Sequence, residues 1–242
     1  STYRMSAALA LAIAFAATSA IAQVKVGVIA STTGPTAVVG IPQKNSVALL
    51  PRKIGDLTVE YIVLDDASDP TQSVMNVKKL LAEQKIDALI GPSGSPNAVG
   101  VVQFMAESGT PMLAPVGTTA VVLPMDDKKR WVFKTTQNDA LISDALIAHM
   151  QKTGVKTVGF IGFNDPYGEN WYNVFNAQAQ KAGIRIVASE RYLRSDGSVT
   201  GQVAKLMAAK PDAVLVAAAG GPTVLPHTTL VDAGYKGRIY QT

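Results

Sequence analysis

The chain has 242 residues, of which 48% are hydrophobic and 17% charged, so it can bury a large core and carries too little charge for a disordered polypeptide. Its formal net charge is +4, and the densest basic run, 128–130, directly follows two aspartates, which excludes a basic stripe for nucleic acid. Cysteine is absent, which excludes disulfides, thiolate metal sites and a cysteine nucleophile.

The first 22 residues have the pattern of an export signal. Arg4 precedes an apolar run over 7–17, and a small-residue segment ends at Ala20-Ile21-Ala22. A basic start, a short apolar core and an A-x-A ending are typical of a secretory signal peptide, and the run is too short for a permanent anchor. We predict that residues 1–22 are a signal peptide cleaved after Ala22; the alternative is a buried N-terminal helix.

Segments typical of strands and of helices alternate in the first half of the mature chain. Apolar, β-branched runs predict strands, while helical periodicity predicts helices, two of them opened by Asp69-Pro70 and Ser95-Pro96 as N-cap and first-turn proline. In chain order the predicted elements are strand 24–30, helix 41–50, strand 59–64, helix 70–82, strand 88–90, helix 98–106 and strands 112–114 and 131–134.

A polar stretch over 135–138 separates this half from a second alternating series. The predicted elements are helix 139–153, strand 157–163, a helix from the turn at 164–168 to Gly183, strand 184–189, helix 199–209, strand 213–218, a helix ending near 234 and a strand from 238. Continuous apolar strands alternating with helices predict parallel sheets covered on both faces. The predicted fold class is therefore α/β, with two doubly wound, Rossmann-like lobes joined by a hinge: an N-terminal lobe at 23–137 and a second lobe at 138–242.

Ligands of open α/β sheets bind beyond the carboxyl ends of the strands, which directs attention to the loops that follow them. Several of these loops open into helices, whose N-terminal N–H groups and partial positive charge favour an anion such as a carboxylate. Ser95 and Thr118 lie at two of them, where each hydroxyl either caps its own helix or binds a ligand oxygen. Tyr167 lies at a third, and Gly168 after it would let a ligand approach closely.

The sequence does not favour catalysis. It has two histidines, each without a second metal ligand at suitable spacing, and it lacks both the G-x-S-x-G elbow and the phosphate-binding loop motif. The acidic cluster Asp65, Asp66 and Asp69 is interpreted as a strand end and a helix cap, because it lacks calcium-loop spacing. We expect no catalytic residue, no cofactor and no metal.

Three motifs together resemble the periplasmic branched-chain amino-acid (Leu/Ile/Val)-binding proteins of ABC transporters, over residues 24–242. They are 63–70 (VLDDASDP), 90–95 (IGPSGS) and 167–169 (YGE). The segments 164–165 and 236–242 resemble a subgroup that often takes aromatic or other organic acids. The resemblance implies a type I periplasmic binding protein, two lobes that close on a ligand, a periplasmic location and a membrane permease as partner.

The resemblance also implies roles for five positions. Ser95 and Thr118 match the hydroxyls that hold the ligand carboxylate, and Val116 matches a backbone carbonyl that accepts from the ligand ammonium. Tyr167 matches an aromatic side chain from the second lobe, and Gly220 lies in the loop facing the other side of the ligand. These residues form the predicted ligand-binding site.

Two positions depart from the family pattern. Val39 replaces an aromatic residue of the first loop, and the acid that meets the ammonium of amino-acid ligands falls just beyond Thr242. Family members are longer, so we expect the chain to be truncated and to bind poorly as it stands.

The sequence favours a monomeric transport protein for a small carboxylate ligand such as an amino acid or an aromatic or other organic acid. A ligand-sensing module of the same fold, coupled to a regulator or receptor, is the alternative. An exported hydrolase ranks third, because it needs a nucleophile and base that the sequence lacks.

Overall fold

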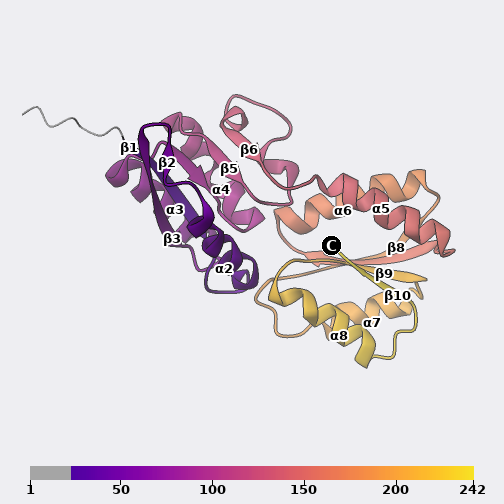
Figure 1. The fold of residues 1–242 in the computed structure, drawn as a ribbon. Helices are drawn as coiled ribbons and strands as arrows, with labels where there is room; N and C mark the ends of the chain where they lie inside the picture. The colour runs from indigo at the N-terminus through magenta and orange to yellow at the C-terminus, as the bar shows by residue number, and fades with distance from the viewer. Residues whose placement is uncertain (1–22) are drawn as a thin grey trace, which may run out of the picture.

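The computed structural model describes residues 23–242, which form two α/β lobes lying side by side (Figure 1). The predicted signal peptide, 1–22, lies outside the described residues. Within 23–242, no helix combines the length and apolar character needed to cross a bilayer. The predicted fold class of two α/β lobes is confirmed.

The first lobe is built on a six-stranded sheet in the order β2-β3-β1-β4-β5-β6. Its strands are β1 (Gln23–Ala30), β2 (Lys53–Ile54), β3 (Leu57–Asp65), β4 (Ala88–Ile90), β5 (Met112–Ala114) and β6 (Val132–Lys134). Its α-helices are α2 (Ala37–Ser46), α3 (Pro70–Lys79) and α4 (Ser95–Ser108), with short helical turns at Val47–Leu49, Leu80–Gln84, Thr119–Val121 and Lys129–Trp131. A core of buried aliphatic side chains and methionines joins the sheet to α3 and α4.

The second lobe is built on a four-stranded parallel sheet in the order β10-β9-β7-β8. Its strands are β7 (Thr157–Phe163), β8 (Arg185–Tyr192), β9 (Ala213–Ala217) and β10 (Arg238–Gln241). Helices α5 (Asp139–Lys152) and α6 (Pro166–Lys181) lie on one face, and α7 (Thr200–Ala208) and α8 (Val224–Asp232), preceded by a turn at Gly221–Thr223, lie on the other (Figure 1). β9 is buried along its whole length because helices cover both of its faces.

The structure corrects three details of the predicted elements. β2 is a short edge strand that pairs antiparallel with β3, so the first sheet is not purely parallel. Helix α4 begins at Ser95 with Gly94 as its N-cap, so Ser95 is not the capping residue. β8 continues three residues beyond the predicted end at Ser189, because Glu190, Arg191 and Tyr192 remain paired with β7.

Each sheet has a point where the strand order reverses. In the first lobe the chain leaves β1 for β3 on one side and then returns to β4 on the other side of β1. In the second lobe β7 is flanked in the same way by β8 and β9. Loops after strands diverge at such points and leave a crevice, which is where open α/β sheets bind ligands.

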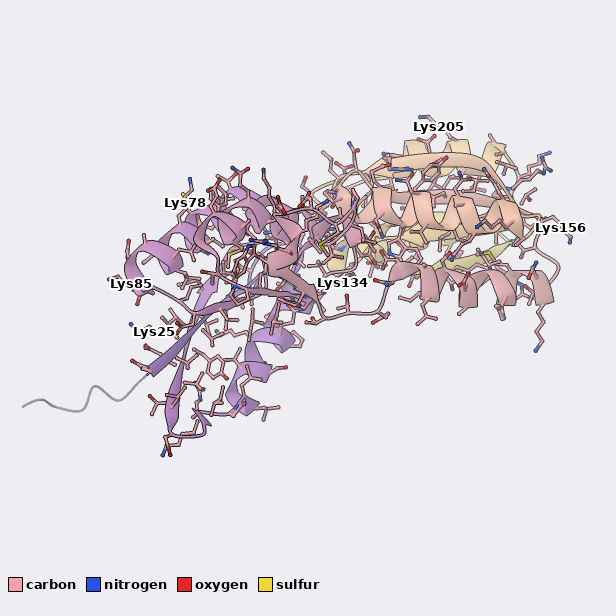
Figure 2. The ribbon with its side chains drawn as sticks, turned by 90° about the horizontal axis from the view of Figure 1, so that it is seen from above. Lys25, Lys78, Lys85, Lys134, Lys156 and Lys205 are labelled. Atoms are coloured by element: carbon pink, nitrogen blue, oxygen red, sulfur yellow. The ribbon has the colours of Figure 1, made fainter. Side chains whose placement is uncertain are left out.

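The two lobes are linked by a segment that the first lobe holds in place. The Lys134 ammonium donates to the carbonyl oxygens of Thr136 and Gln137 at 3.0 and 2.6 Å. Figure 2, seen from above, places Lys134 at the junction between the lobes and spreads the other labelled lysines along the whole molecule.

Candidate ligand-binding cleft

A cavity of about 110 Å³ lies where the two lobes face each other, and loops that follow strands line it. The first lobe contributes residues after β1, β4 and β5, and the second contributes residues after β7, β8 and β9. The lining residues are Thr36, Val39, Ser93, Gly94, Ser95, Pro115, Val116, Gly117, Tyr167, Arg194 and Ala219. The cavity therefore lies at the reversal points of both sheets, where a small ligand is expected.

The structure brings Ser95 and Thr118 together. The backbone N–H of Thr118 points to the Ser95 hydroxyl oxygen at 3.5 Å, and both residues are buried. Ser95 lines the cavity at the first turn of α4, whose N-cap Gly94 supplies no capping side chain. The Thr118 hydroxyl instead accepts from the Ala120 N–H at 3.2 Å, so it caps the short helix that follows. Of the two hydroxyls, the one of Ser95 therefore has the weaker hydrogen bond within the protein and is the more available to a ligand.

Val116 and Gly220 occupy opposite sides of the same region. The Val116 carbonyl, predicted to accept from a ligand ammonium, already accepts from the Thr136 hydroxyl at 2.6 Å. Gly220 has a φ of +79° and lies against the backbone of Pro35, so the loop after β9 contacts the loop after β1 across the lobes. Ala219, next to Gly220, lines the cavity.

Tyr167 lies at the first turn of α6, where Asp165 caps the helix by accepting from the N–H groups of Tyr167 and Gly168 at 2.8 and 3.2 Å. Its ring closes against Gly117, where an added Cβ would lie 2.9 Å from the ring edge. Gly168 does not serve ligand approach as predicted, because the space its missing side chain leaves is filled by the Phe163 backbone at the end of β7. Gly117 thus lets an aromatic ring of one lobe contact the other lobe.

Arg194 also lines the cavity, and the sequence analysis missed it. It follows β8, so the rule that ligands bind in loops after strands applies to it. The predicted strand ended at Ser189, and the sequence analysis named no candidate residue in the loop after it. Recognising 190–192 as part of an edge strand would have identified Arg194 as a candidate.

The acidic cluster of the first lobe, Asp65, Asp66 and Asp69, does not line the cavity but holds the segments next to it in place. Asp69 caps α3, accepting from the N–H groups of Thr71 and Gln72 at 2.6 and 3.2 Å, as the sequence indicated. Asp65 accepts from the loop after β1, including the Thr32 N–H at 2.9 Å, and its pKa falls to about 2 although burial acts in the opposite direction. Asp65 and Asp69 therefore accept hydrogen bonds from backbone N–H groups and, at Asp65, from the Thr33 hydroxyl.

Asp66 is the buried centre of this cluster. Its carboxylate accepts from the hydroxyls of Ser31 and Ser73, both at 2.6 Å, and from the Asn97 amide at 2.8 Å. It also accepts from the Ser68 N–H at 3.0 Å. One carboxylate thus ties the loop after β1 to α3 and α4, and so fixes the first-lobe wall of the cavity.

A second buried carboxylate lies where the linking segment meets the lobes. Asn170 in α6 accepts from the Thr119 hydroxyl at 2.7 Å and donates to Asp139 at 2.5 Å, so it joins the loop after β5 to α5. Burial raises the pKa of Asp139 to about 6, against the opposing effects of the Asn170 hydrogen bond and the Lys134 charge. Asp139 therefore has a pKa of about 6, about two units above that of an ordinary aspartate.

Replacing Asp139 by asparagine is expected to remove a pH dependence of stability. Because the folded pKa of about 6 lies above the ordinary 3.8, this group's stabilisation is complete below about pH 4 and is lost as pH rises through 6. A shift of this size corresponds to up to about 3 kcal/mol. Urea denaturation at pH 4 to 8 should show a flatter profile for Asp139→Asn than for Asp144→Asn, which changes an exposed carboxylate on the same helix. Identical profiles for the two variants would refute the assignment.

The described residues offer no cluster of metal-ligating side chains. Within 23–242, no group of three or more His, Asp or Glu side chains could hold a metal ion. His149 contacts the Tyr240 hydroxyl at 3.0 Å, and His227 contacts the Gln241 amide at 3.1 Å. Both histidines lie in the second lobe on α5 and α8, and neither lines the cavity.

Comparison with known proteins identifies the family. The family model described as periplasmic binding protein matches residues 23–242. Among curated proteins, "Leu/Ile/Val-binding protein homolog 3" of Brucella melitensis biotype 1 is 27% identical, over 97% of this chain and 66% of the relative. That relative carries the branched-chain amino-acid-binding name which the sequence motifs pointed to.

Solved structures share the fold. An extracellular ligand-binding receptor from Rhodopseudomonas palustris HaA2 is 46% identical with a TM-score of 0.88, over 91% of this chain and 61% of the receptor. A solute-binding protein of an ABC transporter from the same organism, in complex with p-hydroxybenzoic acid, is 22% identical with a TM-score of 0.82, over 91% and 61% of the two chains. The chain thus spans about three fifths of these structures' length. It belongs to the periplasmic binding protein family, in the type I branch that includes the Leu/Ile/Val-binding proteins.

Proposed function

We propose that this chain is the ligand-binding part of an extracytoplasmic solute-binding protein, located in the periplasm, that delivers a small carboxylate to an ABC transporter permease. The observation that supports this most is the cavity at the reversal points of both sheets, with the first turn of α4 and Ser95 on its wall. Unpaired helix N–H groups and a hydroxyl suit a carboxylate, which needs donors.

The residues of the cavity also suit a protein that binds and releases its ligand without changing it chemically. A transport protein needs only a difference in ligand affinity between its open and closed forms, and loops from two lobes around one cavity can supply that difference. The relative's name supports an amino acid as ligand, and the complexed Rhodopseudomonas protein supports an aromatic acid. We therefore propose a small amino acid or organic acid, with Ser95, Val116, Thr118, Tyr167 and Gly220 around it.

Alanine at Ser95 is expected to weaken carboxylate binding by about one to two decades, because one desolvated hydrogen bond to a charged group contributes about 1.5–3 kcal/mol. We expect a similar loss for Thr118→Ala and a smaller one for Thr118→Ser, which keeps the cap on Ala120. Calorimetry on the full-length mature protein, with a ligand chosen by a thermal-shift screen of amino acids and organic acids, measures both.

Ser108→Ala is the matched control, because Ser108 lies at the exposed far end of the same helix. Unchanged affinity in both Ser95→Ala and Thr118→Ala would remove the carboxylate site from the proposal. Co-purification with a membrane permease tests the transport role against a sensing role, since a sensing module would instead copurify with a regulator or receptor.

A further inference from the structure

Arg194 is the charged residue of the cavity. Among the described residues that line it, all the others are uncharged. Arg194 comes from the second lobe, directly after β8, whereas Ser95 and the start of α4 come from the first. A cation on one wall thus faces a helix N-terminus on the other.

The guanidinium is held in a fixed position. Its Nε donates to Asp165 at 2.7 Å, and its Cζ atom lies over the Phe163 ring, 4.0 Å from the ring centre. The side chains of Arg194 and Asp165 are only 15% and 14% exposed. Asp165 is itself fixed as the N-cap of α6, so the arginine cannot swing freely. Such bracing reduces the entropy lost when the guanidinium binds a ligand.

The two outer nitrogens of Arg194 have no hydrogen-bond acceptor among residues 23–242. Its Nη1 and Nη2 make no hydrogen bond to the described residues, and only Nε is engaged. Arg191, on the preceding strand, differs: its Nε and both Nη atoms donate to Glu169, Ser189 or the Glu190 carbonyl. Arg194 therefore keeps the paired donors that match a carboxylate in a fork.

We infer that Arg194 is a ligand-binding and specificity-determining residue, and that the ligand is a small dicarboxylate with one acidic group on each lobe. The inference rests on the proposed function, because the first carboxylate is assigned to the α4 N-terminus and Ser95. The second carboxylate pairs with Arg194. A ligand that joins donors on both walls binds the closed form more tightly than the open one, and so drives closure.

Two matched pairs of acids test this by calorimetry on the full-length mature protein: succinate with butyrate, and terephthalate with benzoate. The wild-type protein is expected to bind at least one dicarboxylate about tenfold or more tightly than its matched monocarboxylate. Arg194→Gln should weaken that dicarboxylate by about 10- to 100-fold and change the monocarboxylate by less than about threefold. Arg194→Lys keeps the charge without the fork and should give an intermediate loss.

Arg191→Gln is the matched control, since it changes an arginine three positions away that lies outside the cavity, and it should leave both affinities unchanged. Equal weakening of both acids of a pair by Arg194→Gln would mean that Arg194 and Ser95 share a single carboxylate, which overturns the inference. It is also overturned if the wild-type protein binds neither dicarboxylate or prefers neither to its matched monocarboxylate.

Leucine binding, measured on the same variants, distinguishes a failure of the dicarboxylate inference from a failure of the proposed function. Tight leucine binding that falls in Ser95→Ala but not in Arg194→Gln would keep the carboxylate site and discard the dicarboxylate. If Ser95→Ala leaves every bound acid unaffected, the carboxylate site itself is wrong. Circular dichroism melts of each variant verify that it is folded before binding is compared.

Discussion

Replacing Asp66 by alanine is expected to lower the free energy of unfolding of the first lobe by about 3–5 kcal/mol. The carboxylate is fully buried and accepts four hydrogen bonds, including those from Ser31, Ser73 and Asn97. Its removal would leave the Ser31 hydroxyl and the Ser68 N–H without an acceptor, while Ser73 would keep only the Asp69 carbonyl at 3.1 Å and Asn97 only the Ser73 hydroxyl at 2.8 Å. Desolvated donors without partners cost more than the bonds they made contributed.

Urea denaturation of the full-length protein measures this loss. Asp56→Ala, which removes an exposed carboxylate in the turn between β2 and β3, should change stability by less than about 0.5 kcal/mol. Asp66→Asn should fall between the two, because one oxygen still accepts while the new NH₂ group faces donors. A loss below 1 kcal/mol for Asp66→Ala would show that this network does not hold the lobe together.

Placing alanine at Gly168 is expected to destabilise the second lobe by about 3 kcal/mol. The added Cβ would overlap the Phe163 carbonyl oxygen and lie 2.7 Å from the carbonyl carbon and the nitrogen of the same residue. Backbone atoms at the end of β7 cannot rotate away as a side chain would, so α6 must shift off the sheet. That shift would also move Tyr167 away from Gly117, and ligand affinity should fall together with stability.

Gly201→Ala is the matched control for this change. Gly201 lies near the start of α7, and nothing lies within 4 Å of the Cβ that alanine would add there. In this open position alanine should stabilise the helix by about 0.5–1 kcal/mol, since glycine loses more backbone entropy on folding. Opposite signs for the two variants in thermal melts are the expected result; equal changes would contradict close packing at Gly168.

Asp66 and Gly168 both position residues that line the cavity. Asp66 fixes the loop after β1 and the start of α4, where Ser95 lies, and Gly168 lets α6 approach β7 closely enough to present Tyr167. In each lobe, one buried residue therefore fixes the position of a segment that lines the cavity: Asp66 in the first lobe and Gly168 in the second. Rigid walls of this kind suit a protein that closes by moving whole lobes.

Local patterns determined much of this protein in advance. Short apolar runs located β4 and β7 with the bounds the structure has, and Asp69-Pro70 marks a helix start because a carboxylate one position before a proline can accept from the free N–H groups of the next turn. The same reasoning placed the N-cap of α4 at Ser95, one residue later than the Gly94 of the structure. The loops after β4, β5, β7 and β9 were also identified as candidate site loops, because periodicity and turn residues are properties of neighbours in the chain.

Tertiary structure alone decided which of these loops meet. The order of strands reverses at β1 and at β7, and that order depends on which strands pair, not on any single segment. It also decided that the Thr118 hydroxyl caps a helix while Ser95 lines the cavity, and that Arg194 lines the same cavity with only its Nε bonded to a described residue. Burial and hydrogen-bond partners are set by residues distant in sequence, so local patterns could not reveal them.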